Sequence, residues 1–209
     1  MLVNVVFYVV GLVEDGYSRS VEGSIRADGA VRAPEVADGE IWRIVTSAFF
    51  HVDIIHIGFN MVLLWFLGTA LEAYAGTLRL GIIYFASIVW ASAGALYMDP
   101  FVFTLGASGG VFGLMGVAVW VELREGRKLL GGSIWGLLLL NLVITFAIPG
   151  ISVGGHIGGL LGGVAAAIGL TGFGQYSLSR QSLPGWALTL GFAVLIAGAV
   201  AAIVIANAA

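Results

Sequence analysis

Long apolar stretches, separated by short turns rich in glycine or polar residues, make up most of this chain. A helix needs about 20 apolar residues to cross a hydrocarbon core of roughly 30 Å. Six stretches meet or approach that length: residues 52–74, 78–97, 108–122, 130–148, 153–172 and 185–206. The pattern predicts an all-α fold, a polytopic bundle of membrane helices.

A seventh apolar run covers residues 1–13, but as a helix it would extend only about 20 Å. A cleaved signal peptide is one explanation, although the run lacks a basic start and a small-x-small site before Glu14. We expect instead a first transmembrane segment that is short or incomplete. The chain would then contain seven helices, with residues 14–44 forming a long loop after the first.

Composition strengthens the membrane assignment. Hydrophobic residues make up 59% of the chain and charged residues 10%, against about 25% charge in soluble domains; the mean hydropathy is +1.03. The chain has no cysteine, which excludes disulfides, thiol catalysis and thiolate metal sites. A net charge of -3 without a basic cluster gives no support to nucleic-acid binding.

The distribution of basic residues predicts the orientation of the helices. The turns near 98–107 and 149–152 contain no Lys or Arg, so the positive-inside rule places these turns outside. The segment 14–44 then also lies outside; it has four Arg, but seven acidic residues offset them, and long loops follow the rule weakly. Seven spans would then put the N-terminus inside and the C-terminus outside. The turns predicted to be cytoplasmic carry Arg79, Arg124, Arg127, Lys128 and Arg180.

Four polar side chains from separate spans fall within a few turns of the predicted external face: His56, Asn60, Ser108 and His156. Each has a structural explanation on its own, since a serine can bond its own helix and a histidine or asparagine can bond a neighbouring one. Together they supply a nucleophile, a base and hydrogen-bond donors. Because polar groups in spans usually face the bundle interior or a water-filled cavity, we expect one shared site.

Spacing suggests a role for each of these groups. His56 and Asn60 are four residues apart, so they share one helix face, and both can donate to a developing oxyanion. Ser108 begins its predicted helix, where its own N–H has no intrahelical acceptor. A reacting carbonyl near Ser108 would therefore meet donors from two directions.

Glycines recur at small-xxx-small spacing on the histidine's helix, which permits unusually close helix packing. A Ser–His pair requires such packing, because its two atoms must come within about 3 Å. The glycines could also serve packing alone, and both explanations can hold together. The repeats are Gly155-Gly159-Gly163 and Gly154-Gly158-Gly162, and the serine's helix offers Gly109, Gly113 and Gly116.

No Asp or Glu lies within the spans near His156; Asp53 and Asp99 are at the external rim, where one could still contribute. We therefore predict a dyad rather than a triad. Packing and backbone would orient the base, and Phe112, one turn after Ser108, could stack on the imidazole. Three scattered histidines without nearby carboxylates argue against a metal site, and no cofactor is expected.

Four motifs occur in order over residues 40–163: Glu40-Ile41-Trp42-Arg43, His51-x4-His56-x3-Asn60, Gly106-x-Ser108-Gly109 and Gly155-His156-x2-Gly159-x3-Gly163. In these motifs the chain resembles the rhomboid intramembrane serine proteases. The resemblance implies a six-helix core plus one C-terminal helix. It also implies Ser108 as nucleophile, His156 as general base, and an oxyanion site formed by His56, Asn60 and the Ser108 amide.

Other positions are implied to have supporting roles. His51 would line the water-filled cavity, Trp42 and Arg43 would form the structural signature of the first loop, and Glu72 would be a structural hydrogen-bonding position at the cytoplasmic end. Two positions depart from the family pattern: Phe112 stands where tyrosine is common, and Gly155 where alanine is common. The remaining supporting positions are Phe112, Gly106, Gly109, Gly159 and Gly163.

The resemblance divides the chain into a first transmembrane segment, an external loop, a rhomboid catalytic core, and a linker with an extra transmembrane helix. It implies a protease that cleaves transmembrane segments of other proteins, in the plasma membrane of a prokaryote, with its site open to the external face. A lateral gate would lie near 130–148. The corresponding ranges are 1–13, 14–44, 45–172 and 173–209.

Two other functions stay open. One is a catalytically inactive relative that binds client transmembrane helices, although Ser108 and His156 are both present and Ala107 rather than proline precedes the serine. The other is a small transporter, which would predict midplane charges or matching broken helices in two halves. The sequence displays neither of these transporter features.

Overall fold

A computed structural model describes residues 1–15, 20–179 and 184–209, and its regular structure is helical apart from one antiparallel bridge between Val31 and Thr104. The all-α prediction is confirmed. Arg180, used above to orient the helices, lies outside the described residues. The elements are α1 (Leu2–Asp15), α2 (Ile25–Gly29), α3 (Ala33–Ala37), α4 (Arg43–Thr46), the 3-10 turn η1 (Ser47–Phe49), α5 (Ile54–Ala75), α6 (Thr77–Met98), α7 (Ser108–Glu125), α8 (Trp135–Ala147), α9 (Val153–Leu170) and α10 (Gly185–Ala208).

Within the described residues, four helices are long and apolar enough to cross a membrane: α5, α6, α9 and α10. Helices α1 and α8 are apolar but shorter. Helix α7 has 18 residues, and its last two turns contain Glu122, Arg124 and Glu125. The predicted spans agree with the helices to within a few residues, with one exception.

The exception is α8, which was predicted over 130–148 but begins only at Trp135. Leu129 and Leu130 extended the apolar count, yet they lie in the loop before the helix. Gly131 has a φ of 74°, a left-handed conformation that interrupts a right-handed helix. The 13 residues that remain are about 20 Å long, so α8 is shorter than its neighbours.

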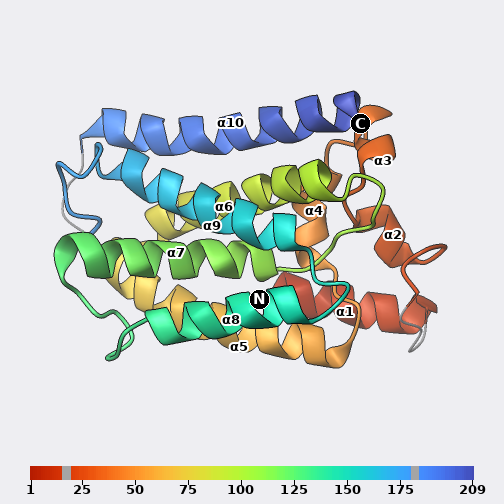
Figure 1. Cartoon of the computed structure of the whole chain (residues 1–209), viewed down its shortest axis with the longest axis horizontal. Helices are drawn as coiled ribbons and strands as arrows, with labels where there is room; N and C mark the ends of the chain where they lie inside the picture. Colours follow the sequence, from red (N-terminus) through yellow and green to blue (C-terminus); the bar gives the residue numbers. More distant parts are fainter. Residues whose placement is uncertain (16–19, 180–183) are drawn as a thin grey trace.

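The long helices lie side by side in layers (Figure 1), with α10 along one edge, α6 and α9 beside it, then α7, and α5 and α8 on the far side. One buried cluster joins α5, α6, α7 and α9, and a second joins α10 to α6 and α3. The short helices α2 to α4 gather at the end of the bundle where α7 and α9 begin. The turns α5–α6 and α7–α8 lie at the opposite end.

Helix α9 packs closely against two neighbours through its two glycine stripes. A Cβ atom on Gly158 would collide with the carbonyl oxygen of Trp90 in α6. A Cβ on Gly159 would collide with the carbonyl oxygen of Gly109 in α7. Each stripe therefore serves a different neighbour, and the close packing predicted for the serine's helix is confirmed.

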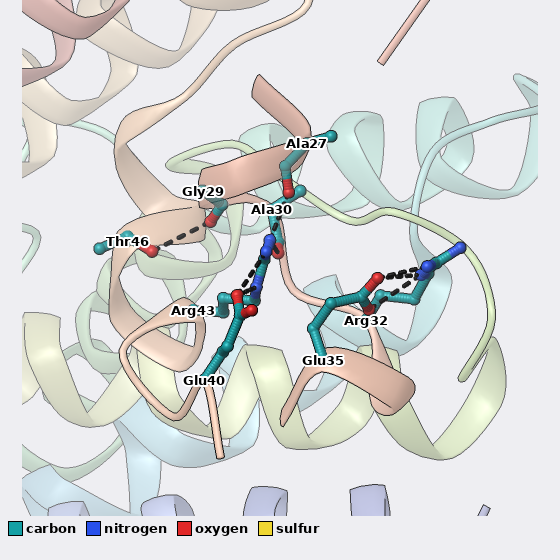
Figure 2. Close-up of polar contacts among 8 residues, drawn as sticks. All are labelled: Ala27, Gly29, Ala30, Arg32, Glu35, Glu40, Arg43 and Thr46. Carbon is teal, nitrogen blue, oxygen red and sulfur yellow. Dashed lines mark hydrogen bonds and ion pairs between the residues drawn. The ribbon is translucent and has the colours of Figure 1, made fainter. Parts of the chain in front are cut away.

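Within the predicted loop 14–44, the described residues from 20 onward form short helices that Arg43 connects (Figure 2). The Arg43 side chain is buried; its guanidinium donates to the carbonyl oxygens of Ala27 and Ala30, the latter at 3.0 Å, and to the Glu40 carboxylate at 2.6 Å. These bonds join the end of α2 to α4. We call residues 20–49 the α2–α4 segment.

A second ion pair in this segment lies nearer the surface. Arg32 donates to the Glu35 carboxylate (Figure 2), and its guanidinium lies 4.2 Å from the ring centroid of Phe103. The hydrogen bonds from Arg32 lower the pKa of Glu35 below its ordinary value. Thr46 donates to the carbonyl oxygen of Gly29 at 3.0 Å, a further bond between α4 and α2.

At the end of the bundle away from the α2–α4 segment, two carboxylates accept hydrogen bonds that connect neighbouring elements. Glu125 at the end of α7 accepts hydrogen bonds from Tyr74 of α5, from Ser177 at 2.6 Å and from the amide of Leu178 at 2.9 Å. These bonds attach the linker that precedes α10. Glu72 accepts from Thr77 at 2.7 Å, which connects the end of α5 to the start of α6.

Candidate active site

Ser108 is the first residue of α7, and its hydroxyl meets the imidazole of His156 from α9. Ser108 Oγ lies 2.8 Å from His156 Nε2, and His156 is buried. The turn before the serine depends on Gly106, whose φ of 127° is strained for any residue with a side chain. The pair therefore has hydrogen-bonding geometry suited to a nucleophile and its base.

Phe112 lies one turn after Ser108 on the same side of α7. Its ring is parallel to the imidazole of His156, with centroids 4.1 Å apart and an angle of 18° between the planes. The stacking expected from the sequence is present. It restricts how far the imidazole can tilt.

Thr145, which the sequence did not identify as a site residue, contacts Nδ1, the second ring nitrogen of His156. Thr145 Oγ1 lies 2.7 Å from His156 Nδ1, and the same hydroxyl lies 2.7 Å from the carbonyl oxygen of Asn141, one turn earlier in α8. Only 2% of Thr145 is exposed. A signal existed, because Asn141 and Thr145 are polar residues four apart in an otherwise apolar helix.

His56 lies near the start of α5, against the turn that precedes the nucleophile. Asp53 caps this helix, accepting a hydrogen bond from the His56 amide at 2.8 Å. A Cβ atom placed on Gly106 would lie 2.7 Å from His56 Nε2. The imidazole of His56 is thus within contact distance of the nucleophile's own loop.

Asn60 shares the face of His56, as its spacing predicted. Its side-chain amide donates to the carbonyl oxygen of His56 at 2.9 Å, and Asn60 is buried. An asparagine amide carries two N–H groups, and this bond uses one of them. The second N–H is available to a ligand.

His51, which the family resemblance assigns a supporting place at the cavity, is buried behind His56. The two rings pack edge-on, with centroids 4.9 Å apart. His51 Nε2 accepts a hydrogen bond from the Ala107 amide at 3.3 Å. Burial lowers the pKa of His51 to about 3, so the ring is neutral and can accept this bond.

A cavity of about 1070 Å³ is lined by most of the polar residues described above. Trp42 is exposed and Arg43 belongs to the α2–α4 segment, so neither is part of the cavity wall. Gly159 and Gly163 lie in the α7–α9 interface instead. Of the candidate residues, those that line the cavity are His56, Asn60, Gly106, Ser108, Gly109, Phe112 and His156; Thr145 lines it as well.

Comparison with known proteins adds independent support for the family. The rhomboid domain family matches residues 38–173, a range that contains both Ser108 and His156. Rhomboid protease GluP of Bacillus subtilis (strain 168) is 37% identical over 186 residues, which cover 85% of this chain and 36% of GluP. The chain therefore spans about a third of the length of that relative.

Two further relatives are covered over more of their length. Rhomboid-like protease 3 of Toxoplasma gondii is 28% identical over 190 residues, 87% of this chain and 69% of the relative. The putative rhomboid protease YdcA of Bacillus subtilis (strain 168) is 32% identical over 133 residues, 61% of this chain and 66% of the relative. With its apolar helices and a family match over more than half its length, the chain is an integral membrane protein that belongs to the rhomboid family.

Proposed function

We propose that this protein is a serine endopeptidase that cleaves peptide bonds within the membrane. The observation that carries the proposal is the 2.8 Å contact between Ser108 Oγ and His156 Nε2, at the wall of a cavity inside a bundle of apolar helices. Named proteases of the rhomboid family among the relatives support the same reaction class.

In this mechanism His156 acts as general base for Ser108. The serine hydroxyl passes its proton to His156 Nε2 as Oγ attacks the carbonyl carbon of the scissile bond. The protonated imidazole then gives that proton to the leaving amine, which departs and leaves an acyl-enzyme on Ser108. A water molecule, activated by the same imidazole, hydrolyses the ester and restores both groups.

The negative oxygen of the tetrahedral intermediate needs donors, and three candidate groups belong to residues that line the same cavity. These are the amide of Ser108, free of an intrahelical acceptor at the start of α7, the imidazole of His56, and the second N–H of Asn60. Each donor removed from such a site elsewhere costs about 3–4 kcal/mol of transition-state stabilisation. We assign the oxyanion site to these groups.

The expected substrates are transmembrane segments of other membrane proteins. The apolar exterior of the bundle suits a site reached from the lipid. Val31, Ser47 and Ala48 line the cavity, which therefore lies toward the end of the bundle that carries α2 to α4. The short turns at the opposite end carry Arg79, Arg124, Arg127 and Lys128, as expected for a cytoplasmic face, whereas the four Arg of the long loop 14–44 are offset by seven acidic residues. We infer that the cavity opens to the external side of the plasma membrane of a prokaryote.

Labelling with a fluorophosphonate serine probe in detergent tests this proposal. The wild-type protein should be labelled and should cleave a reporter transmembrane substrate, whereas Ser108→Ala should do neither. Ser87→Ala is a matched control, because Ser87 is buried and bonds the carbonyl oxygen of Ile83 within its own helix at 2.7 Å. A wild-type protein that resists the probe but binds transmembrane helices would be an inactive, client-binding relative.

Two further variants separate the roles of the other residues. His156→Ala should abolish both labelling and cleavage, since the nucleophile loses its base. Asn60→Ala should lower the cleavage rate without eliminating it, because two donors would remain. An unchanged rate in Asn60→Ala would remove Asn60 from the oxyanion site.

A further inference from the structure

The hydroxyl of Thr145 has one proton and two close neighbours, and only one arrangement satisfies both. The carbonyl oxygen of Asn141, 2.7 Å away, can only accept a hydrogen bond, so the hydroxyl must donate to it. His156 Nδ1 lies 2.7 Å from the same hydroxyl. The hydroxyl can therefore engage Nδ1 only as an acceptor, and Nδ1 must carry a proton.

This assignment fixes the state of the whole imidazole. A neutral imidazole carries one N–H, so Nδ1–H leaves Nε2 with a free electron pair. That pair faces Ser108 Oγ at 2.8 Å, as a general base requires. We propose that Thr145 is a positioning residue that holds His156 in its basic tautomer, at the place where Ser-His-Asp triads have a carboxylate.

A hydroxyl differs from a carboxylate in what it can supply. It is neutral, so it offers little charge to offset the imidazolium that forms when the base takes up a proton. Its contribution lies in the choice of tautomer and in the rotation of the ring within its plane. Phe112, which stacks on the face of the imidazole, limits tilt instead, so the two contacts have separate effects.

The contact between Thr145 and His156 is supplied by α8, a helix at the edge of the bundle. Within α8, Leu138 and Thr145 are the buried residues, while Leu139, Val143 and Phe146 are more than half exposed. A displacement of α8 would therefore break the bond to Nδ1 without disturbing the contact between α7 and α9. The tautomer of His156 therefore depends on α8 remaining packed against α9.

The inference rests on the proposed function and is tested first by kinetics. Thr145→Val keeps the shape of the side chain but removes the hydroxyl. We expect kcat for a reporter substrate to fall by about 10- to 100-fold, the range found for partners that orient metal-bound histidines. KM should change little. Thr145→Ser should recover most of the lost rate, because the hydroxyl returns.

Thr171→Val provides a matched control. Thr171, the residue that caps the C-terminal end of α9, is fully buried and donates to the carbonyl oxygen of Ala167, four residues earlier, at 2.8 Å, as Thr145 does to Asn141. It lies at the end of α9 far from His156. Its kcat should stay within about twofold of the wild type. An equal loss of kcat in Thr171→Val and Thr145→Val would overturn the proposal.

Nitrogen-15 NMR of labelled histidine, in the Ser108→Ala background, tests the tautomer without any need for activity. The His156 signals, assigned by their loss in His156→Ala, should show a protonated Nδ1 and an unprotonated Nε2 at pH 8. Adding Thr145→Val should shift the population toward Nε2–H. Unchanged signals in that variant would refute the proposal, even if kcat falls.

The two readouts also separate this inference from the proposed function. Cleavage retained by Ser108→Ala would remove the protease mechanism, while the NMR comparison would still decide whether Thr145 sets the tautomer. Conversely, suppose that the enzyme is active but that resting His156 carries its proton on Nε2. That result would refute the role of Thr145 and leave the proposed protease function intact.

Discussion

Phe112 and His156 are parallel rings whose centroids lie 4.1 Å apart, although they belong to different helices. Because α7 also carries Ser108, one helix presents both the nucleophile and the surface on which the base rests. The imidazole is thus bounded by Phe112 on its face, Ser108 at Nε2 and Thr145 at Nδ1.

Removing the stacked ring should slow the reaction without preventing it. Contacts of this kind contribute about 0.5–1.5 kcal/mol, so Phe112→Ala should lower kcat by roughly 2- to 10-fold. Phe112→Tyr keeps the ring and should remain near the wild-type rate. Phe192→Ala, on the half-exposed surface of α10, is the control and should have no effect on reporter cleavage.

Gly106 should tolerate no side chain, for two separable reasons. Its φ of 127° is strained for alanine, and the added Cβ would lie 2.7 Å from His56 Nε2. Gly106→Ala should therefore displace His56 and reduce cleavage at least about 10-fold, corresponding to the loss of part of one oxyanion donor. The variant would be measured by cleavage rate and by the rate of probe labelling.

Gly126→Ala separates the two reasons. Gly126 also has a positive φ, 67°, but a Cβ there would meet nothing within 4 Å. That variant should lower the melting temperature slightly and leave the cleavage rate unchanged. Equal activity losses in the two variants would mean that His56 is not the target of the clash.

Burial predicts that Arg43 and Arg32, two of the arginines of the α2–α4 segment, contribute differently to the free energy of unfolding. Arg43→Gln would leave the carbonyl oxygens of Ala27 and Ala30 without their charged donor, and we expect a loss of about 2 kcal/mol or more in the free energy of unfolding. Arg32→Gln breaks a partly exposed pair with Glu35 and should cost less than about 1 kcal/mol. Unfolding in mixed micelles would compare them, and a larger loss for Arg32→Gln would contradict the assignment.

His51 should make the protein sensitive to acid. Its folded pKa of about 3 lies below the ordinary value of 6.5, so the unfolded chain binds more protons between these two pH values. The stability associated with neutral His51 is complete above pH 6.5 and is lost as the pH falls toward 3. His51→Gln has no such proton to bind.

Melting temperatures in detergent at several pH values between 7.5 and 4 would measure this effect. The wild type should lose more stability on acidification than His51→Gln, and the difference between them should shrink steadily below pH 6.5. His156 is present in both proteins, so its contribution cancels, and the difference between the curves reports His51 together with its contact to His56. Parallel curves for the two proteins would exclude His51 as an acid-sensitive group.

Much of this fold could be predicted from hydrophobic pattern alone, because each long helix must present apolar side chains to lipid on one side and to its neighbours on the other. The glycine repeats indicated the α7–α9 contact, since Gly109 and Gly159 leave nothing between the two backbones. The start of α8 was predicted five residues too early, because leucines count as apolar whether they lie in a helix or in a loop.

The part of the site that the sequence did not reveal depends on tertiary contacts. A threonine in an apolar helix ordinarily bonds the carbonyl one turn earlier, and Thr145 does so here. Nothing local shows that its hydroxyl also reaches His156. The same applies to His51, whose bond to the Ala107 amide appears only when residues 56 positions apart come together.

The backbone amides of the two residues before Ser108 donate to groups that lie outside the long helices. The Gly106 amide donates to the carbonyl oxygen of Ser47 at 2.8 Å, and the Ala107 amide donates to His51. Arg43 in turn ties the stretch that leads to Ser47 to the end of α2. The smallest fragment able to hold the nucleophile in place would therefore have to retain the α2–α4 segment and His51, and a unit trimmed to its membrane helices would lose the support of its own reactive serine.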